Sequence, residues 1–397
     1  MMQMTGPRIG IISPVDLMNH QPVGGLSGFL ANLLGAFRFP VRVYGVAVNR
    51  KAKRWAPVSL SANVQFVPVA GVRYPSPIPM RLKALLAYSR YRSRILSYGM
   101  DLLYIHSVES ALPFLFGKNR VPTVYHQHGS HNPVQLSGYR LARLKAFQFI
   151  FDKMLNLVHR RSDWTIAIDA HCREQVIRNG AGHKVSLLMN GVDTEVFRPD
   201  LQARQRMRRK FSLGKKRVIL FAGRLEAGKG VDKIIEALRI LNERKDTYSA
   251  FVLGEGSQKK CLQDLVVKRH MQDVISFAGA IPHNQLRDFY NMADVLLLPS
   301  EREGIPMVVL EALACGTPVI ASDQGGIPGL LRDGRNGHIA KELSPVYIAR
   351  AAQELLALNL DRYGVAKSVE GHSSDHHARN LEEIFLRLTE HREKRVR

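Results

Sequence analysis

Short runs of apolar residues alternate with longer helix-patterned segments along the whole chain of 397 residues. A buried parallel strand appears as a short continuous apolar run, whereas an amphipathic helix places apolar residues at every third or fourth position. We therefore predict strands at residues 9–12, 41–48, 64–67, 102–105, 123–126, 164–168, 217–222, 250–253, 274–277, 295–298 and 318–321. Helices are predicted at residues 26–37, 81–97, 139–159, 201–210, 231–244, 261–270, 284–291 and 306–314. This alternation favours an α/β fold of βαβ units, with a parallel sheet in each half.

A segment rich in turn residues, Met189–Asp200, separates the two halves. The chain is too long for one ordinary core, so we predict two Rossmann-like, doubly wound domains facing a central cleft. The first covers residues 1–195 and the second residues 196–375, with a loop near 364–375. A basic amphipathic helix at 376–397 ends the chain.

The formal charge of +23 is unevenly distributed. Before residue 101, Asp16 is the only acidic residue, against thirteen Arg and Lys. This asymmetry indicates an acidic partner, such as anionic lipid, a lipid-linked pyrophosphate or nucleic acid; simple solubility is the alternative explanation. No recognisable nucleic-acid-binding signature occurs, so we expect no nucleic-acid partner.

The sequence also bears on the compartment. No apolar run reaches the ~20 residues that span a bilayer, and the N-terminus lacks the pattern of a signal peptide. The three cysteines are widely spaced. We expect a cytoplasmic protein.

The segment from Pro299 to Pro318 carries the most informative chemistry. The strand at 295–298 precedes it, Pro306 occupies the expected first helical position, and Gly316 follows the helix. Glu303 therefore lies on the strand-to-helix loop and Glu311 in the helix. That loop faces the crevice where open α/β sheets bind ligands, and paired carboxylates suit the hydroxyls of a sugar or ribose. The alternative is a capping glutamate and a solvated one.

A second loop, between the strand at 217–222 and the helix from Val231, contains Gly223, Arg224, Gly228, Lys229 and Gly230. Its glycines allow a ligand to approach the backbone, and the helix N-terminus supplies N–H groups. The two cations beside them resemble a diphosphate-binding site. The loop is not a Walker motif, and a purely structural turn is the alternative.

In the first half, Gly24-Gly25 precedes a helix, where backbone N–H groups would reach a phosphate; a loop that needs positive φ is equally consistent. The segment His126-Gln-His128-Gly-Ser-His131 ends a strand. Three histidines suggest a metal site, but no carboxylate or cysteine pattern accompanies them. A single histidine that hydrogen-bonds a polar ligand is the better interpretation.

These motifs occur together in one order: Gly24-Gly25, Asn190-Gly-Val-Asp193, the Arg224–Lys229 loop and Glu303-x7-Glu311. In this respect the chain resembles the family 4 retaining glycosyltransferases of GT-B fold over nearly its full length. The resemblance implies a nucleotide-sugar donor, UDP- or GDP-linked, in the second domain and a sugar or lipid-linked acceptor in the first. It also implies that the last helix crosses back to pack on the first domain.

The resemblance further implies the residue roles. Arg224 and Lys229 would neutralise the pyrophosphate in place of a metal, so neither metal nor cofactor is expected. Glu303 would contact the transferred sugar, and Glu311 the ribose. His128 would lie beside the sugar. The remaining donor-binding residues would be Gly24, Gly25, Gly223, Gly254, Phe277, Ala278, Gly304, Ile305, Pro306 and Met307.

Two other enzyme functions are compatible with the same fold, a sugar-nucleotide epimerase and a phosphorylase. A phosphorylase would need a pyridoxal-binding lysine context, which is not found in the sequence. By family breadth and charge, the acceptor is expected to be a lipid-linked glycan of a bacterial surface polysaccharide. The helix at 79–97 would dock on the inner face of the membrane through Leu82, Leu85, Leu86 and Leu96, flanked by Arg and Lys. An ordinary cytosolic helix with solvated cations is the alternative.

Overall fold

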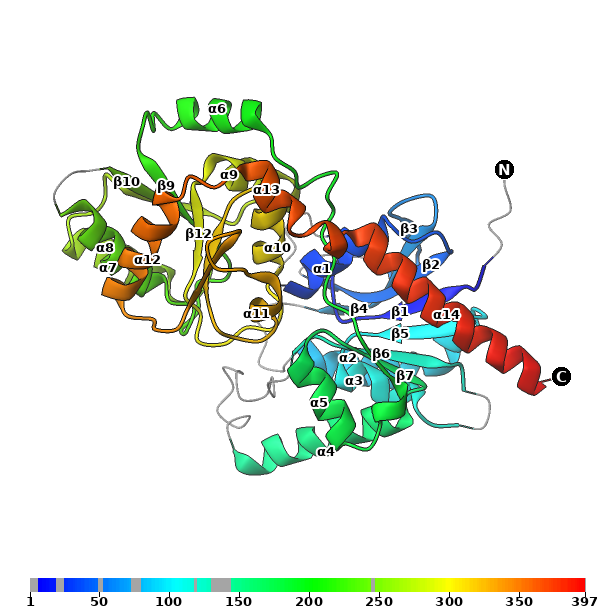
Figure 1. The fold of residues 1–397 in the computed structure, drawn as a ribbon. Coiled ribbons are helices and arrows are strands. Elements are labelled where there is room, and N and C mark those ends of the chain that lie inside the picture. The colour runs from blue at the N-terminus through cyan, green and yellow to red at the C-terminus, as the bar shows by residue number, and fades with distance from the viewer. Residues whose placement is uncertain are drawn as a thin grey trace. The chain divides into compact units, whose positions relative to one another are not determined.

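The computed structural model describes residues 6–18, 25–48, 53–72, 80–117, 120–129, 144–243 and 247–396 (Figure 1). The chain divides into two compact units. The first comprises residues 1–19, 30–189 and 375–397, and the second residues 20–29 and 190–374. Each unit has its own largely parallel sheet with helices, which confirms the predicted α/β class.

The first unit contains an eight-stranded sheet with the order β3-β4-β2-β1-β5-β6-β7-β8. Its pairings are parallel except for β3 with β4. The strands are β1 Ile9–Ile12, β2 Val41–Val48, β3 Val58–Ser59, β4 Val64–Val72, β5 Leu102–Ile105, β6 Thr123–Gln127, β7 Trp164–Ala167 and β8 Val185–Leu187. From β1 the chain builds the sheet in one direction and from β5 in the other. The carboxyl ends of these two strands therefore form a topological switch point, where such sheets bind ligands.

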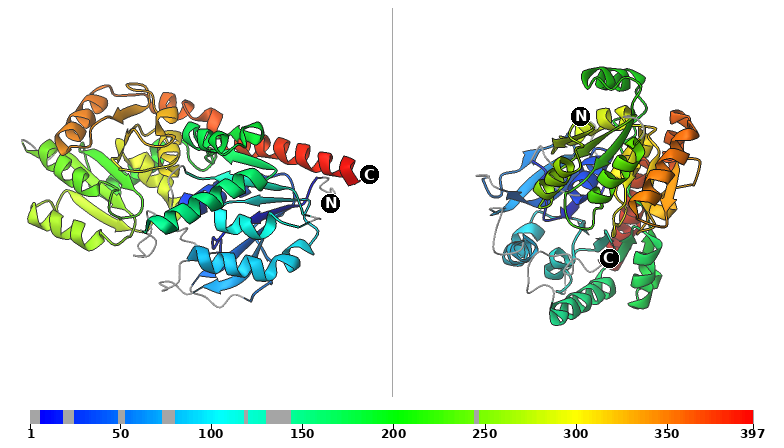
Figure 2. Two further views of the ribbon diagram at one scale, coloured as in Figure 1. Left: turned by 90° about the horizontal axis from the view of Figure 1, so that it is seen from below. Right: turned by 90° about the vertical axis from the view of Figure 1, so that its left-hand side faces the viewer.

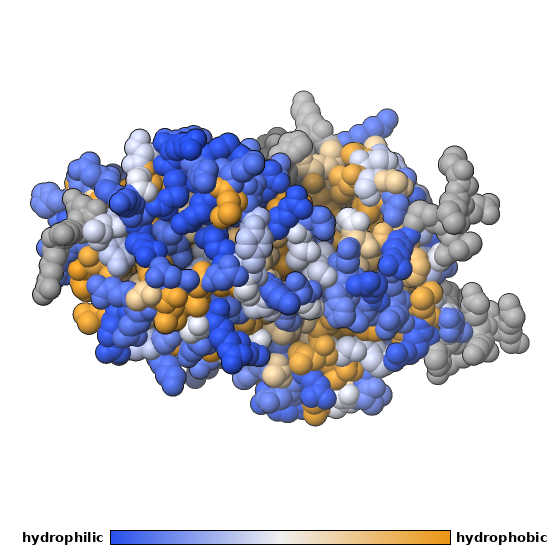
Figure 3. Space-filling view, turned by 45° about the horizontal axis from the view of Figure 1, so that its top comes forward, coloured by the Kyte–Doolittle hydropathy of each residue, from blue (hydrophilic) through white to orange (hydrophobic). Residues whose placement is uncertain are grey.

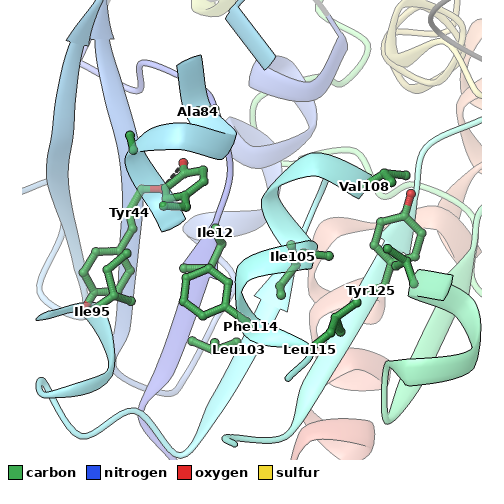
Figure 4. Close-up of a cluster of buried hydrophobic side chains, with 14 of the residues drawn as sticks. Ile12, Tyr44, Ala84, Ile95, Leu103, Ile105, Val108, Phe114, Leu115 and Tyr125 are labelled. Atoms are coloured by element: carbon green, nitrogen blue, oxygen red, sulfur yellow. Dashed lines mark hydrogen bonds between the residues drawn. The ribbon is translucent and has the colours of Figure 1, made fainter. Parts of the chain in front are cut away.

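Helices α2, α3 and α4 cover one face of this sheet. Leu103 and Ile105 of β5 point into a core that also contains Tyr88 of α2 and Phe151 of α4 (Figure 4). The hydroxyl of Tyr88 donates to the carbonyls of Ser13 and Tyr44, both at 2.9 Å, so this buried polar group is satisfied. Helix α1, Gly25–Leu34, is divided between the two units. The other described helices of the first unit, besides the last helix of the chain, are α2 Met80–Leu96, α3 Val108–Ala111, α4 Lys145–Arg161 and α5 Ala170–Arg178, with 3₁₀ turns at Leu112–Phe114 and Gly182–Lys184.

The opposite face of the sheet packs on α14, Ser374–Val396, the long helix that ends at the C-terminus in Figures 1 and 2. Tyr104 of β5 lies outside that core, because side chains alternate along a strand, and it contacts Phe385 edge-on at 5.3 Å. The carboxylate of Glu382 accepts from the backbone N–H of Arg38 at 2.6 Å. The last helix therefore packs on the first unit, as the resemblance implied.

The second unit contains a six-stranded parallel sheet with the order β11-β10-β9-β12-β13-β14. Its strands are β9 Arg217–Ala222, β10 Tyr248–Leu253, β11 Ile275–Gly279, β12 Val295–Leu298, β13 Val319–Ser322 and β14 Gly337–Ala340. Here β9 and β12 are the central neighbours from which the chain proceeds in opposite directions. Their carboxyl ends form the switch point of this sheet.

The helices of the second unit are α6 Leu201–Lys210, α7 Val231–Asn242, α8 Lys259–Lys268, α9 His283–Met292, α10 Met307–Ala314, α11 Ile327–Leu330, α12 Pro345–Ala357 and α13 Arg362–Lys367, with a 3₁₀ turn at Glu370–His372. Two predictions are corrected here. The expected loop at 364–375 contains the end of α13 and the 3₁₀ turn. Pro306 is the N-cap of α10, with φ −72° and ψ 122°, and not its first helical residue. An N-cap residue is extended rather than helical, and the proline ring is compatible with that conformation.

On the face shown in Figure 3 hydrophilic residues predominate and hydrophobic residues form separate patches. None of the helices in the described part of the chain has the length and apolar character needed to span a bilayer.

Candidate active site

The switch point of the second unit brings two of the predicted functional side chains together. Lys229 lies on the loop after β9 and Glu303 on the loop after β12. The Lys229 Nζ donates to Glu303 Oε1 at 2.6 Å. Both side chains are largely buried, with 22% and 11% of their surfaces exposed. An ion pair this sheltered is screened less by water than a surface pair.

Tight backbone packing fixes the loop that carries Lys229. Gly230 is the N-cap of α7 with φ +72°, and a Cβ there would lie 2.3 Å from the Pro299 carbonyl oxygen. The Gly228 carbonyl accepts from Glu301 N–H at 2.8 Å. These contacts join the loop after β9 to the loop after β12, so Lys229 and Glu303 are held by one rigid structure. Arg224, on the same loop, is exposed.

A second close contact aligns the loops after β9 and β10. A Cβ on Gly254, which has φ +130°, would lie 1.8 Å from the Gly223 carbonyl oxygen. Gly254 also donates to the Gly279 carbonyl at the end of β11, at 2.7 Å. Phe277 and Ala278 lie on that strand, half-buried and exposed respectively. Gly223 and Gly254 therefore have a demonstrable packing role beside any contact with a ligand.

The loop from Pro299 to Pro306 is supported from two directions. The Asn190 side chain, which is buried, donates to the Ile305 carbonyl at 3.2 Å. Gly326 N–H donates to the Gly304 carbonyl at 2.9 Å. The backbone between Gly304 and Met307, assigned to donor binding by resemblance, is thus fixed from outside its own loop.

Glu311 is not a solvated helix residue, because only 1% of it is exposed. His283 Nε2 donates to its Oε1 and the Tyr290 hydroxyl to its Oε2, each at 2.8 Å. Burial lowers the pKa of His283, but the hydrogen bond and charge of Glu311 outweigh it, so the net pKa is raised. A carboxylate has about four lone-pair sites, so Glu311 retains capacity for ribose hydroxyls. Sequence reasoning did not find His283 and Tyr290; their spacing along α9 was the available signal.

Gly24 and His131 lie outside the described residues, and Gly25 begins α1, in the segment 20–29 that belongs to the second unit. His128 directly follows β6 and is partly buried. Its Nε2 lies 2.8 Å from Nδ1 of His106, the residue after β5, and its ring stacks on His126 at 4.1 Å between centroids. His106 was not identified from the sequence, because its partner is far away in the chain.

His106, His126 and His128 lie close enough together to be considered as metal ligands. One nitrogen from each lies within 4.8 Å of the others. The short contact between His106 and His128, however, is a hydrogen bond, which requires a proton between the two nitrogens. Burial and the charge of His377 lower the pKa of His128 to about 3. Neutral imidazoles therefore describe this cluster; His106 and His128 share a hydrogen bond, and His126 Nδ1 is hydrogen-bonded to the Tyr104 hydroxyl.

Both halves of the chain match models of known protein families. A model of "Glycosyltransferase Family 4" matches residues 23–196, and one of "Glycosyl transferases group 1" matches residues 203–367. A GDP-mannose-dependent alpha-(1-6)-phosphatidylinositol monomannoside mannosyltransferase of Mycolicibacterium smegmatis is 35% identical over 174 residues, which are 42% of this chain and 46% of the relative. A D-inositol 3-phosphate glycosyltransferase of Streptomyces scabiei is 34% identical over 203 residues, 48% of this chain and 45% of the relative.

The chain thus spans about half the length of these curated relatives. Among solved structures, a sucrose-phosphate synthase from Thermosynechococcus elongatus superposes with a TM-score of 0.81 at 19% identity. That match covers 96% of this chain and 99% of the synthase, so it extends the likeness in fold to nearly the whole sequence.

Proposed function

Because the chain belongs to the family 4, group 1 glycosyltransferases and has their GT-B fold, we propose that it is a glycosyltransferase. It transfers a hexose from a UDP- or GDP-linked donor to an acceptor, with retention of anomeric configuration. The observation that carries this proposal is the ion pair between Lys229 and Glu303 at the switch point of the second unit.

The pair fits the charges that develop when a sugar leaves a nucleoside diphosphate. Negative charge grows on the departing phosphate, and positive charge grows on the sugar ring. Lys229 would pair with the phosphate, assisted by Arg224 on the same loop, while Glu303 would face the ring and its hydroxyls. Preorganised charges of this kind lower the barrier without reorganisation during the reaction. With two cations at the phosphate, transfer proceeds without a divalent metal.

The donor nucleoside would bind beside these groups. Glu311 accepts from the ribose hydroxyls, and Phe277, Ala278 and Gly254 lie towards the base and pyrophosphate. By resemblance, the Gly24-Gly25 pair would contact the donor phosphates and His128 would lie beside the transferred sugar. Same-face attack with the leaving phosphate accepting the acceptor proton gives retention, and Glu303 positions the sugar.

The acceptor is a lipid-linked glycan of surface polysaccharide synthesis, used at the inner face of the cell membrane. The M. smegmatis relative is named for a phosphatidylinositol mannoside, and the net charge of +23 would favour an anionic surface. We infer that a second helix, α4, supports membrane docking beside the predicted helix at 79–97, which is α2. In α2 the core face is Ala84, Ala87, Tyr88 and Ile95.

Three cations of α2 already make contacts within the first unit. Arg81 pairs with Glu109 at 3.3 Å, Arg92 donates to the Phe116 carbonyl at 2.8 Å, and Arg94 stacks over Trp55 at 4.4 Å. Like α2, which exposes Leu82 and Leu86, the N-terminal end of α4 exposes adjacent apolar side chains, with Lys145 and Lys153 beside them. The exposed apolar residues are Leu144, Phe147, Phe149 and Ile150. Aromatic residues with flanking cations suit the interface of an anionic bilayer.

The test is a donor screen. Purified protein, treated exhaustively with chelator, is incubated with UDP-, GDP- and ADP-sugars, with and without a membrane lipid extract. We expect transfer from one nucleotide class and a product whose anomeric configuration matches the donor. Conversion to another nucleotide sugar without acceptor would indicate an epimerase, and phosphate-dependent release of a sugar phosphate a phosphorylase. Activity that needs added manganese would contradict metal independence.

A further inference from the structure

A histidine at the switch point of the first unit has no role in the function proposed above. His106 is the first residue after β5, and its backbone N–H donates to the Ile12 carbonyl at the end of β1, at 3.2 Å. His128 is the first residue after β6, the strand next to β5. The two side chains therefore meet where a parallel sheet presents its ligand-binding edge.

The two rings are joined by one hydrogen bond. His106 Nδ1 and His128 Nε2 are 2.8 Å apart, and the ring planes differ by 23°. Burial lowers the pKa of both groups, and the charges of neighbouring histidines lower it further. Two neutral imidazoles share a single proton across this contact. One nitrogen donates and the other accepts, and the remaining nitrogen of His128 must have the opposite character.

We propose that His106 is a positioning residue, which fixes the ring orientation and the tautomer of His128. In this arrangement His106 donates its Nδ1–H to His128 Nε2, so that His128 carries its own proton on Nδ1. His126 completes the clamp: it stacks on the His128 ring at 16° between planes, and its own Nδ1 is hydrogen-bonded to the Tyr104 hydroxyl. The catalytic consequence rests on the function proposed for this enzyme.

Substitutions can separate this hydrogen bond from simple packing. In His106→Asn the side-chain amide replaces Nδ1, whereas in His106→Gln it lies one bond further out. We expect Asn to keep the turnover number within about threefold, and Gln and His106→Leu to lower it about 10–100-fold, as for other residues that orient a functional histidine. The KM for the donor should change little. Equal losses in Asn and Gln would overturn the proposal.

The tautomer itself is measurable without any reaction. In full-length protein labelled with ¹⁵N-histidine, two-bond nitrogen–proton spectra distinguish the Nδ1–H from the Nε2–H form, and His128→Ala identifies the relevant signals. We expect His128 as the single Nδ1–H tautomer in wild type and in His106→Asn, and as a mixture in His106→Gln.

The kinetic and the spectroscopic measurements test different claims. An unchanged His128 tautomer in His106→Gln, or an Nε2–H form in wild type, would refute the positioning role. Absence of transferase activity in wild-type protein would refute the proposed function, and the spectra would still decide the role of His106. Urea unfolding of each variant identifies any loss that arises from misfolding.

Discussion

At the residue scale, the Lys229–Glu303 pair places a cation and a carboxylate where a sugar–phosphate bond would separate charge. Lys229→Ala should lower turnover on the order of 100-fold, because it removes charge stabilisation that matters most in the transition state. Lys233→Ala is the matched control. Lys233 lies one turn into α7 and pairs with the exposed Glu301 at 3.3 Å, a contact of little energetic value. Steady-state kinetics with the identified donor measure both. Equal losses in the two variants would remove Lys229 from the reaction.

Glu311 leads to a different expectation, because its carboxylate holds two donors inside the protein. Glu311→Ala leaves the Tyr290 hydroxyl and the His283 N–H without their acceptor, at a cost of about 2–4 kcal/mol in unfolding free energy. Glu303→Ala should lower the free energy of unfolding less than Glu311→Ala does, since its partner Lys229 can still reach water. It should lower turnover more, because Glu303 is proposed to position the transferred sugar. Urea denaturation and donor KM values separate these effects. A Glu311→Ala protein as stable as wild type would show that the two hydrogen bonds contribute nothing net.

At the element scale, the sequence predicted the parts of the fold where local pattern and tertiary structure agree. The runs that became β1, β5, β9 and β12 are continuous and apolar because both faces of these strands are buried. The strands β3, β8 and β14 were not predicted: β3 has two residues, and β14 contains Gly337 and His338. The helix α12 was also not predicted, although Ser344 caps it and Pro345 occupies its first turn.

The same distinction applies to the candidate site. Glu303, Arg224 and Lys229 could be placed on their loops, because strand, loop and helix are contiguous in sequence there. The partners of Glu311 and His128 could not. His283 and His106 reach their carboxylate and imidazole partners across 28 and 22 residues, and no periodic pattern records such contacts. The predicted leucine face of α2 is partly observed, because Leu82 and Leu86 are exposed while Ala84 and Tyr88 pack inside. Docking of this face on a membrane stays a prediction.

The apolar end of α4 gives the element-scale prediction. A triple variant with serine at Phe147, Phe149 and Ile150 should lose at least tenfold in binding to anionic vesicles, because it removes side chains that are 46–62% exposed and would enter the interface. The control is serine at Arg90, Arg92 and Arg94 of α2, which should weaken binding less and mainly at low salt. Vesicle co-sedimentation at two salt concentrations measures both. Equal binding to neutral and anionic vesicles, or an α4 variant that binds like wild type, would contradict this assignment.

At the scale of the whole molecule, the chain combines a formal charge of +23 with a group of histidines that stay neutral inside the first unit. Burial lowers the pKa of His106 and His126 well below the usual value, that of His128 to about 3, and that of His159 to about 4. Neighbouring charges add to each shift: other histidines act on the first three, and Lys184 on His159. Protonating any of them in the folded state would place a charge in a poorly hydrated site.

The sign of the resulting pH dependence follows from linkage. Unfolded histidines bind protons below pH about 6.5, whereas in the folded state His159 binds a proton only near pH 4 and His128 only near pH 3, so acidification favours the unfolded state. Each such group costs about 1.4 kcal/mol per pH unit below that value. His283, with its raised pKa, acts in the opposite direction, but it belongs to the second unit. The first unit should therefore be the acid-sensitive one.

Tryptophan fluorescence can follow the unfolding of the first unit separately from that of the second, because Trp55 and Trp164, the two tryptophans of the chain, both lie in the first unit. Urea unfolding followed by tryptophan fluorescence should show midpoints that fall steadily from pH 7 to pH 5, before most carboxylates titrate. His159→Gln should reduce the fall of the urea midpoint with pH by about the contribution of one histidine. Substitution of the exposed His171 should leave that fall unchanged. Constant or rising midpoints on acidification would mean that the buried imidazoles are already protonated in the folded protein. In that event the hydrogen bond between His106 and His128 would join an imidazolium to a neutral imidazole, and the neutral tautomer assigned to His128 would have to be abandoned.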